Sequence, residues 1–241
     1  MEAGLYVGLS GQLALQRRLD TIANNVANST TAGFRAENVT FETVLSQTSR
    51  SSVAYSGTGD GTFSRHSGPI VQSTNPLDIA VHGDAYLAVN GGNGPVYTRD
   101  GRMRISTLGD LENMNGQQVL DAGGGPIQLN PNRGPIQIGR DGTISQSGQT
   151  VGRIGLFNIP AAAKLVRHEG AAIVPDLPAE PVVDFVKHGI AQGFVENANV
   201  NAVLEMTRLI SVTRAFEAMT AATDQSDRKL SDAIKALGSG R

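Results

Sequence analysis

Cysteine is absent from this chain of 241 residues, and so is tryptophan. Without thiols the chain can form no disulfide, no thiolate metal site and no cysteine nucleophile. Aromatic residues make up only 5% of the sequence, which leaves little material for platforms that stack on bases or sugars. The formal net charge is −2, so we expect no overall electrostatic attraction to nucleic acid or to an anionic membrane.

Recognisable catalytic and metal-binding patterns are missing as well. No HExxH arrangement and no GxSxG nucleophile turn occurs. The histidines lie at no metal-ligand spacing from one another; they are His66, His82, His168 and His188. Asp100-Gly101 and Asp141-Gly142 are typical of turns, because the alternating acidic residues of a calcium loop are missing around them. We therefore expect no enzyme activity, no metal and no cofactor.

The first residues predict neither a cleaved secretory signal nor a membrane span. Met1-Glu2-Ala3-Gly4 carries no basic residue. The apolar stretch behind it is interrupted by polar and charged side chains, namely Gln12, Gln16, Arg17, Arg18 and Asp20. If the protein leaves the cytoplasm, we expect it to use a route without a cleaved signal.

The last stretch, Asn201 to Leu237, predicts one long amphipathic helix. Residues at intervals of seven fall on one face, and only Thr223 among them is polar: Leu209, Phe216, Thr223, Leu230 and Leu237. Asn201 is a suitable N-cap, with Glu205 in the first turn. At 1.5 Å per residue the helix would be about 55 Å long, so its apolar face needs a long partner.

A second apolar stripe predicts a helix from about Leu5 to Ala27 at the other end of the chain. The residues on this stripe are Leu5, Leu9, Leu13, Leu15, Leu19, Ile22 and Val26. A helix of about 23 residues and one of about 37, flanking a β domain, cannot both bury their stripes fully within one copy. We favour contacts with neighbouring copies, and the alternative is a bundle closed within one monomer.

Between the helices, Asn75 to Val186 is typical of β structure, and glycine is plentiful at 29 residues. Short alternating segments are separated by turns such as Asn115-Gly116. The predicted strands are 78–81, 85–89, 96–99, 103–106, 110–113, 136–138, 143–145 and 152–157. This spacing favours a small antiparallel barrel or sandwich.

The predicted organisation is therefore α+β, with long terminal helices that pair in a coiled-coil-like assembly and a central antiparallel β domain. Ser46 to Ser67 is rich in Ser, Thr and Gly and indicates a linker or a mobile extended arm. Ala161 to Arg167 suggests one or two helical turns, and Gly189 to Asn199 is expected to connect the β region to the last helix. The predicted divisions are residues 1–33 (helix and loop), 34–74 (arm), 75–190 (β domain) and 191–241 (helix).

Several motifs resemble the signature of the bacterial flagellar rod and hook family. The first is an ANNxAN pattern followed by Gly-Phe and a basic residue: Ala23, Asn24, Asn25, Asn28, Gly33, Phe34 and Arg35. The others are a YTRxG segment and a motif that opens the last helix: Tyr97, Thr98, Arg99 and Gly101, then Glu196, Asn199, Val200 and Asn201. Ala32 and Val26 depart mildly from the family, which often has Pro or Asn and Leu at these places. The motifs occur in the right order at both ends and in the middle.

The resemblance implies a structural subunit of the axial rod that crosses the periplasm, exported unfolded by the flagellar type III system. The length favours a rod protein over a hook protein, and Ser10-Gly11 with the residues after Gly33 favours the proximal over the distal rod. The implied partners are further copies and other rod proteins, with no nucleic acid or small-molecule substrate. The expected contact residues are Leu5, Leu9, Leu19, Ile22, Val26, Leu209, Phe216, Leu230 and Leu237, in the same or a neighbouring copy.

One interpretation from a different class stays open. A secreted β-domain enzyme or carbohydrate-binding module could carry helical ends that hold an oligomer together. It would need a cleft with converging polar or aromatic side chains, and the β region is poor in aromatics.

Overall fold

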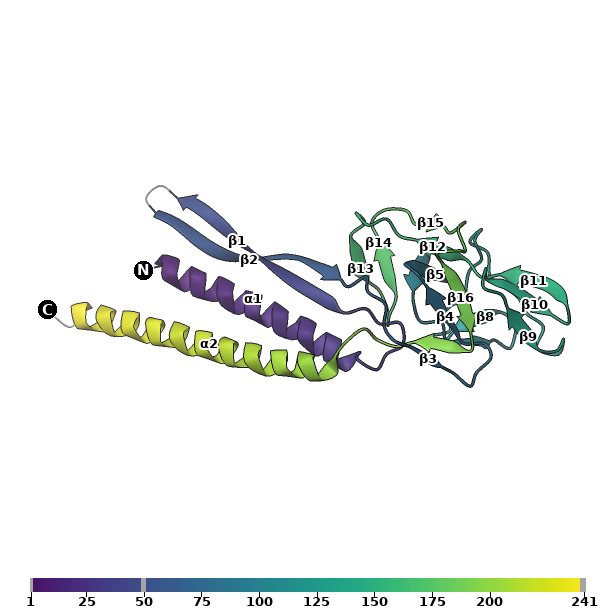
Figure 1. Ribbon diagram of the computed structural model, residues 1–241. Helices are drawn as coiled ribbons and strands as arrows, with labels where there is room; N and C mark the ends of the chain where they lie inside the picture. Colours follow the sequence, from purple (N-terminus) through teal and green to yellow (C-terminus); the bar gives the residue numbers. More distant parts are fainter. Residues whose placement is uncertain (1, 49–50, 239–241) are drawn as a thin grey trace. The chain divides into compact units, whose positions relative to one another are not determined.

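The computed structural model describes residues 2–48 and 51–238, with side chains except at 2–5, 41–48, 51–60, 230, 233, 234, 236 and 238. The fold is α+β: the helix α1 (Glu2–Ala27) comes before a series of strands in the chain, and the helix α2 (Ala202–Gly238) follows them (Figure 1). Both helices appear where the 3.6-residue periodicity predicts them. No described helix combines the length and the hydropathy that crossing a membrane requires.

The chain forms two compact units. Met1–Ala27, Glu37–Thr62 and Asn201–Arg241 make up the first, which we call the helical unit. The second, which we call the β unit, consists of Asn28–Ala36 and Phe63–Val200.

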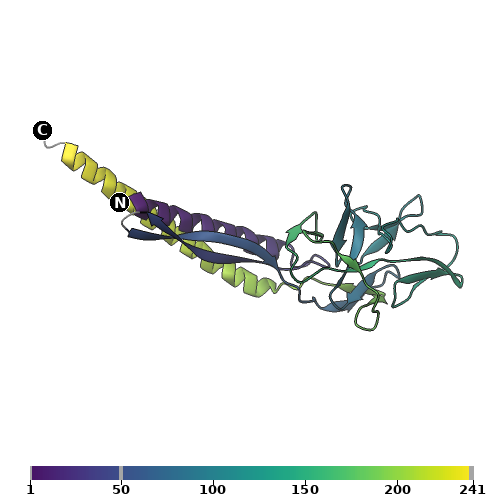
Figure 2. The same ribbon diagram turned by 90° about the horizontal axis from the view of Figure 1, so that it is seen from above.

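In the helical unit, α1 and α2 lie side by side (Figures 1 and 2). Gly8 of α1 faces Thr223 and Gly11 faces Met219, so the two helices run in opposite directions. The sequence favoured neighbouring copies as partners for the apolar stripes. In the structure, part of each helix meets the other helix of the same chain.

The helical unit also contains β1 (Glu37–Thr48) and β2 (Ser51–Phe63), which reaches one residue beyond it. The two strands form a two-stranded sheet, and β1 packs against α1. The sequence predicted a linker or a mobile extended arm in this region and assigned no strands to it. Pairing prevails because the two long extended segments satisfy each other's backbone N–H and C=O groups.

The β unit is centred on an antiparallel sheet of six short strands. Their order across the sheet is β13 (Leu165–Arg167), β14 (Ile173–Pro175), β6 (Pro95–Thr98), β5 (Ala85–Asn90), β12 (Leu156–Asn158) and β15 (Glu180–Pro181). Successive side chains of β5 point to opposite faces. Ala85, Leu87 and Val89 enter one buried cluster and Tyr86 and Ala88 another, so this strand is apolar throughout.

Smaller sheets complete the β unit. One has three strands, β9 (Ile136–Ile138), β10 (Thr143–Gln146) and β11 (Gln149–Arg153). The pairs are β7 (Met103–Ile105) with β8 (Leu111–Asn113), β4 (Ile79–His82) with β16 (Gly189–Gln192), and β3 (Ile70–Gln72) with β17 (Phe194–Glu196).

Two local predictions in the β unit are corrected. Ala161–Arg167 is not helical beyond a turn, because Leu165–Arg167 pairs with Ile173–Pro175 as β13 and β14. The segment from Gly189 to Asn199 is more than a connection, since it carries β16 and β17. Both pair with strands more than a hundred residues earlier, which no local pattern reveals.

Candidate functional site

The less exposed residues of α2 recur along one face of the helix. The steps between them alternate between four and three, which is the spacing of a helix seam. These residues are Glu205, Leu209, Val212, Phe216, Met219 and Thr223. Glycines on α1 allow close approach to this face. A Cβ on Gly8 would lie 3.1 Å from Thr223 Oγ1, and one on Gly11 would lie 3.1 Å from Met219 Cε.

Each helix also bears apolar side chains that stay about half exposed or more in the described part of the structure. Tyr6, Leu9 and Leu13 are 56%, 48% and 61% exposed; we call them the α1 stripe. The α2 stripe consists of Val203, Met206 and Ile210, which are 76%, 50% and 57% exposed. Because the helices are antiparallel, the α1 stripe lies beside the C-terminal half of α2, whereas the α2 stripe lies in its first turns. The two stripes are therefore separate surfaces at different ends of the helix pair.

The predicted contact residues differ in exposure. Ile22 is buried, whereas Leu9 and Leu237 are exposed. The half-buried residues are Leu19, Val26, Leu209 and Phe216. The side chains of Leu5 and Leu230 lie outside the described part of the structure. The role of all nine residues as subunit contacts stays a prediction.

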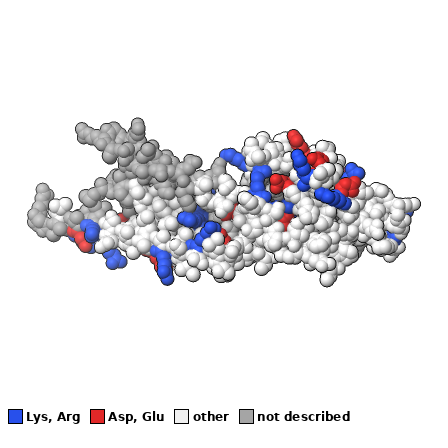
Figure 3. Space-filling view, in the orientation of Figure 1, with Lys and Arg blue, Asp and Glu red and all other residues white. Residues whose placement is uncertain are grey.

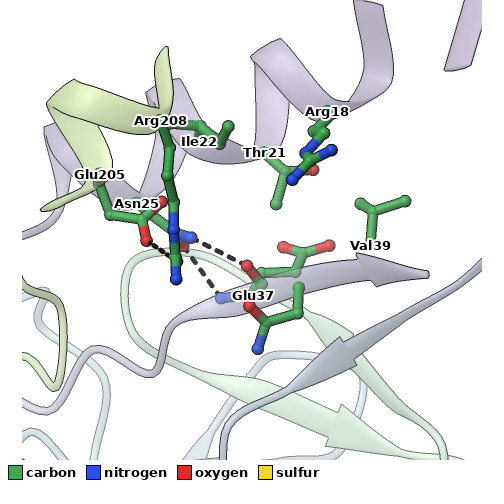
Figure 4. A pocket seen from close by; sticks show the side chains of 9 residues that line it. Arg18, Thr21, Ile22, Asn25, Glu37, Val39, Glu205 and Arg208 are labelled. Carbon is green, nitrogen blue, oxygen red and sulfur yellow. Dashed lines mark hydrogen bonds and ion pairs between the residues drawn. The ribbon is translucent and has the colours of Figure 1, made fainter. Parts of the chain in front are cut away.

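A small polar cleft lies in the helical unit, where the end of α1, the start of α2 and β1 meet (Figure 4). Asn25 is 2% exposed; its Nδ2 donates to the carbonyl of Glu37 at 2.9 Å, and its Oδ1 accepts from the Glu37 N–H at 3.0 Å. Arg208 Nη1 donates to Glu205 Oε1 at 2.5 Å. Asn25 therefore joins α1 to β1, a structural task for the second Asn of the ANNxAN motif.

No group of three or more His, Cys, Asp or Glu among the described residues could hold a metal ion. On the face drawn in Figure 3, Lys and Arg are interspersed with Asp and Glu rather than gathered into one basic area.

The main buried charge cluster of the β unit joins three motif segments. Glu196 at the end of β17 is 1% exposed and lies between two arginines that are nearly as buried. Its Oε2 accepts from Arg99 Nε at 2.8 Å and lies 2.6 Å from Arg99 Nη2, and its Oε1 lies 3.0 Å from Arg35 Nη2. The N–H of Gly68 also donates to Oε1 at 2.9 Å.

Two arginines on one glutamate leave an excess positive charge. Arg99 directs much of its guanidinium to backbone carbonyl oxygens, donating to Gly83 and Val81 at 2.7 Å each and also to Ala85. The guanidinium of Arg35 makes fewer hydrogen bonds, because its Nε and Nη1 are buried without a hydrogen-bond partner in the described structure. Burial lowers the pKa of Arg35 from its usual value, and the negative charge of Glu196 partly opposes this.

Two motif glycines are required by close backbone contacts. Gly33 has φ +67°, and a Cβ there would lie 2.2 Å from the amide nitrogen of Asp100. A Cβ on Gly101 would lie 1.9 Å from the carbonyl oxygen of Ile79. No side chain fits at either position, so the Gly-Phe pair and the YTRxG segment each need their glycine.

The structure brings most motif residues into the β unit's interior rather than onto its surface. Phe34, Tyr97, Thr98 and Arg99 are 1%, 7%, 3% and 1% exposed. Others are less enclosed: Asn24, Asn28, Asn199 and Val200 are half-buried, and Ala23 and Asn201 are exposed. Asn201 caps α2 as predicted, since its Oδ1 accepts from the Leu204 N–H at 3.1 Å.

Sequence reasoning did not select Arg35 and Glu196 as site residues, although both stand within the motifs. It also gave no role to Arg167, whose guanidinium lies 4.2 Å from the ring centroid of Phe34. The available signal was the charge of Arg35 and Glu196 inside otherwise uncharged motif segments.

Three family models match the chain, each over one of these regions. The model described as "Flagella basal body rod protein" matches residues 5–35. "Flagellar hook protein FlgE/F/G D1 domain" matches residues 80–146, and "Flagellar basal body rod FlgEFG protein C-terminal" matches residues 191–236.

Full-length relatives agree with these matches. The chain is 49% identical to the flagellar basal-body rod protein FlgF of Mesorhizobium japonicum, with 99% of each chain covered. The chain belongs to the flagellar basal-body rod protein family. It is also 43% identical to FlgF of Rhizobium meliloti, with both chains covered completely. Against the rod protein FlgG of Bacillus subtilis the identity is 30%, with 97% of this chain and 98% of the relative covered.

Family membership confirms the resemblance read from the motifs. The chain is a structural rod protein of the flagellar basal body, and it is more similar to these two FlgF relatives than to this FlgG relative. Membership of this family indicates assembly with other rod proteins.

Proposed function

We propose that this chain is a subunit of the proximal flagellar rod that polymerises through its terminal helices, in a coiled-coil-like arrangement, as part of the drive shaft across the periplasm. Its partners in the rod are further copies and other rod proteins. It is exported by the flagellar type III apparatus without a cleaved signal, and it acts as a structural element rather than as an enzyme. In this proposal residues 1–33 and 191–241 supply the rod helices, and residues 75–190 form the separate β domain.

The observation that carries the proposal is the pair of exposed apolar stripes on the helical unit. Exposed residues such as Leu13, Val203 and Ile210 would each lose contact with water in a polymer, which favours association. The stripes differ from each other and lie at different ends of the helix pair. A contact between the α1 stripe of one copy and the α2 stripe of the next is heterologous, and such contacts repeat into a filament or a helical stack.

The proximal position rests on the relatives. The full-length relatives with 49% and 43% identity are named FlgF, whereas the FlgG of Bacillus subtilis reaches 30%. A distal rod subunit of the same family is the alternative, and it would use the same helical surfaces.

The proposal is tested by placing a charge on the α2 stripe. Ile210→Asp keeps the chain folded, because residue 210 is 57% exposed, but it puts an unpaired carboxylate where the neighbour would pack. We expect cells that carry only this variant to lose swimming and complete rods. The purified variant should keep the circular dichroism spectrum of the original chain.

The matched control is Val183→Asp, which adds the same charge at an apolar residue of the β unit that is 89% exposed. We expect this variant to swim normally. Normal rods and normal swimming with Ile210→Asp would contradict assembly through α2.

A further inference from the structure

The chain passes between its two compact units four times, after residues 27, 36, 62 and 200. On the β-unit side, the residues next to these crossings belong to three stretches, 28–36, 63–68 and 196–200. We call these the connecting segments. They are far apart in the sequence, yet side chains of the family motifs hold them together.

Asn199 lies in the third connecting segment, and its side-chain amide bonds to both of the others. Its Oδ1 accepts from the N–H of Ala36 at 2.7 Å. Its Nδ2 donates to Ser64 Oγ at 3.0 Å and to the carbonyl oxygen of His66 at 2.8 Å. A single planar group therefore satisfies three partners from two other segments.

Backbone hydrogen bonds run between the same segments. The N–H of Gly33 donates to the carbonyl of Glu196 at 2.8 Å, and the N–H of Ser64 donates to the carbonyl of Ala36 at 2.8 Å. The N–H of Asn197 donates to the carbonyl of Pro69, just beyond the second segment, at 2.9 Å. None of these three amides bonds to the side chain of Asn199, so each reports independently on its segment.

Two charged groups reinforce the arrangement. Glu196 binds Arg35 of the first segment and the N–H of Gly68 in the second. The guanidinium of Arg167 lies between two rings, 4.2 Å from the centroid of Phe34 and 4.8 Å from that of Phe63. These rings come from the first and second segments, and the cation–π contacts tie both to β13.

We infer that Asn199 and Glu196 are positioning residues that make the three connecting segments one cooperative joint: loss of the Asn199 side chain loosens the three segments together, while Glu196 still anchors them to the β core through Arg99. The motif residues Gly33, Phe34 and Asn199 then act within each chain and not as contacts between subunits. This inference does not depend on the proposed mode of assembly, because it concerns the isolated chain.

Amide hydrogen exchange on the purified full-length chain tests the inference, with Asn199→Ala compared with the original sequence. We expect exchange of the Gly33, Ser64 and Asn197 amides to accelerate together by about tenfold or more, because the hydrogen bonds that join the segments are lost. Amides of β5, such as that of Leu87, should keep their original rates.

The matched control is Asn201→Ala, which removes the same side chain two residues further on. Asn201 caps α2 through the N–H of Leu204, so this variant should accelerate exchange in the first turn of α2 and leave Gly33 and Ser64 unchanged. Asn199→Ser provides a second variant if the alanine variant does not fold. Its hydroxyl is shorter and can replace only part of the amide's hydrogen bonds, and we expect a smaller acceleration of the same three amides.

Two results would overturn the inference. Acceleration confined to Ala36, or absent altogether, would show that the segments do not open together. Equal acceleration in β5 would show that Asn199 supports the whole β unit rather than a separate joint. Neither result would bear on assembly through the helical stripes, which the Ile210→Asp experiment tests.

Discussion

Arg35 Nη2 lies 3.0 Å from Glu196 Oε1, and the two side chains retain only 4% and 1% exposure. Arg99 occupies the other oxygen of the same carboxylate. Two guanidinium groups are buried against one carboxylate, and two nitrogens of Arg35 lack acceptors. The desolvation free energy of such a cluster can exceed the attraction between its charges. The cluster is better understood as fixing which segments meet than as adding to the free energy of folding.

The first prediction compares the loss of the negative charge of Glu196 with the loss of one of its two arginine partners. Glu196→Gln leaves two buried guanidinium groups without a counter-charge, and we expect it to lower the free energy of unfolding by about 3–5 kcal/mol. Arg35→Met leaves a paired Arg99 and Glu196, and we expect a clearly smaller loss. Urea unfolding of both variants measures the difference. A larger loss from Arg35→Met would contradict this account.

A second prediction concerns the face of α2 that carries the predicted interface. Phe216 is half-buried, so Phe216→Asp places a charge on the seam of the helix pair. We expect reduced helical content in the purified chain, loss of rod assembly in cells and an intact β unit. Circular dichroism and a motility assay measure the first two effects. Ala218→Asp adds the same charge at an exposed position and should preserve helical content. Normal rods with Phe216→Asp would contradict a role of this face of α2 in assembly.

The third prediction uses the two glycines where α1 approaches α2. Replacing either by Ala favours the helix by about 1 kcal/mol. At Gly11 the new Cβ meets the flexible end of Met219, which can move aside, so we expect Gly11→Ala to raise the midpoint of thermal unfolding of the helical unit. At Gly8 it meets Thr223, a stiff β-branched residue whose Oγ1 donates to the Met219 carbonyl.

We therefore expect Gly8→Ala to be less stable than Gly11→Ala. Adding Thr223→Ala should remove the difference, because the crowded hydroxyl is then gone. Equal stability of the two single variants would show that the helices do not pack as closely as these contacts indicate.

A fourth prediction concerns the Gly-Phe pair of the motif. Gly33→Ala would drive a Cβ into the backbone of Asp100, so we expect a loss of more than about 4 kcal/mol or a chain that does not fold. Gly92 has a similar positive φ, +84°, but a Cβ there meets nothing within 4 Å. Gly92→Ala should therefore cost only the conformational strain, about 1–2 kcal/mol. Denaturant unfolding compares the two, and similar losses would refute the close approach at Gly33.

The fifth prediction concerns pH. The hydroxyl of Thr143 donates to Asp141 Oδ2 at 2.6 Å and lowers the pKa of that carboxyl below its usual value of 3.8. Because the folded pKa is the lower one, the associated stability is present above pH 3.8 and is lost as the pH falls through the folded value. Thr143→Val should raise the pKa of Asp141, measured by NMR titration of the carboxyl carbon. An unchanged pKa would show that Thr143 does not set it.

Local patterns determined much of this fold. The stripe with Leu209 and Phe216 predicts α2, and Asn201 predicts its cap, because helix periodicity and capping depend on residues within a few positions. Turns such as Asn115-Gly116 mark the hairpins for the same reason. The motifs around Asn25, Gly33 and Asn199 were sufficient to identify the family.

Only the tertiary structure shows which residues far apart in the sequence come into contact. Arg99 and Glu196 are 97 positions apart, and β17 pairs with β3 only because the chain returns to it. The sequence left open whether α1 packs against α2 of its own copy or of a neighbour. An apolar stripe predicts that a helix face is buried, but it does not specify which surface covers that face. It also could not show that Asn199 and Glu196 gather distant segments, because that requires their atoms to be within hydrogen-bonding distance in space.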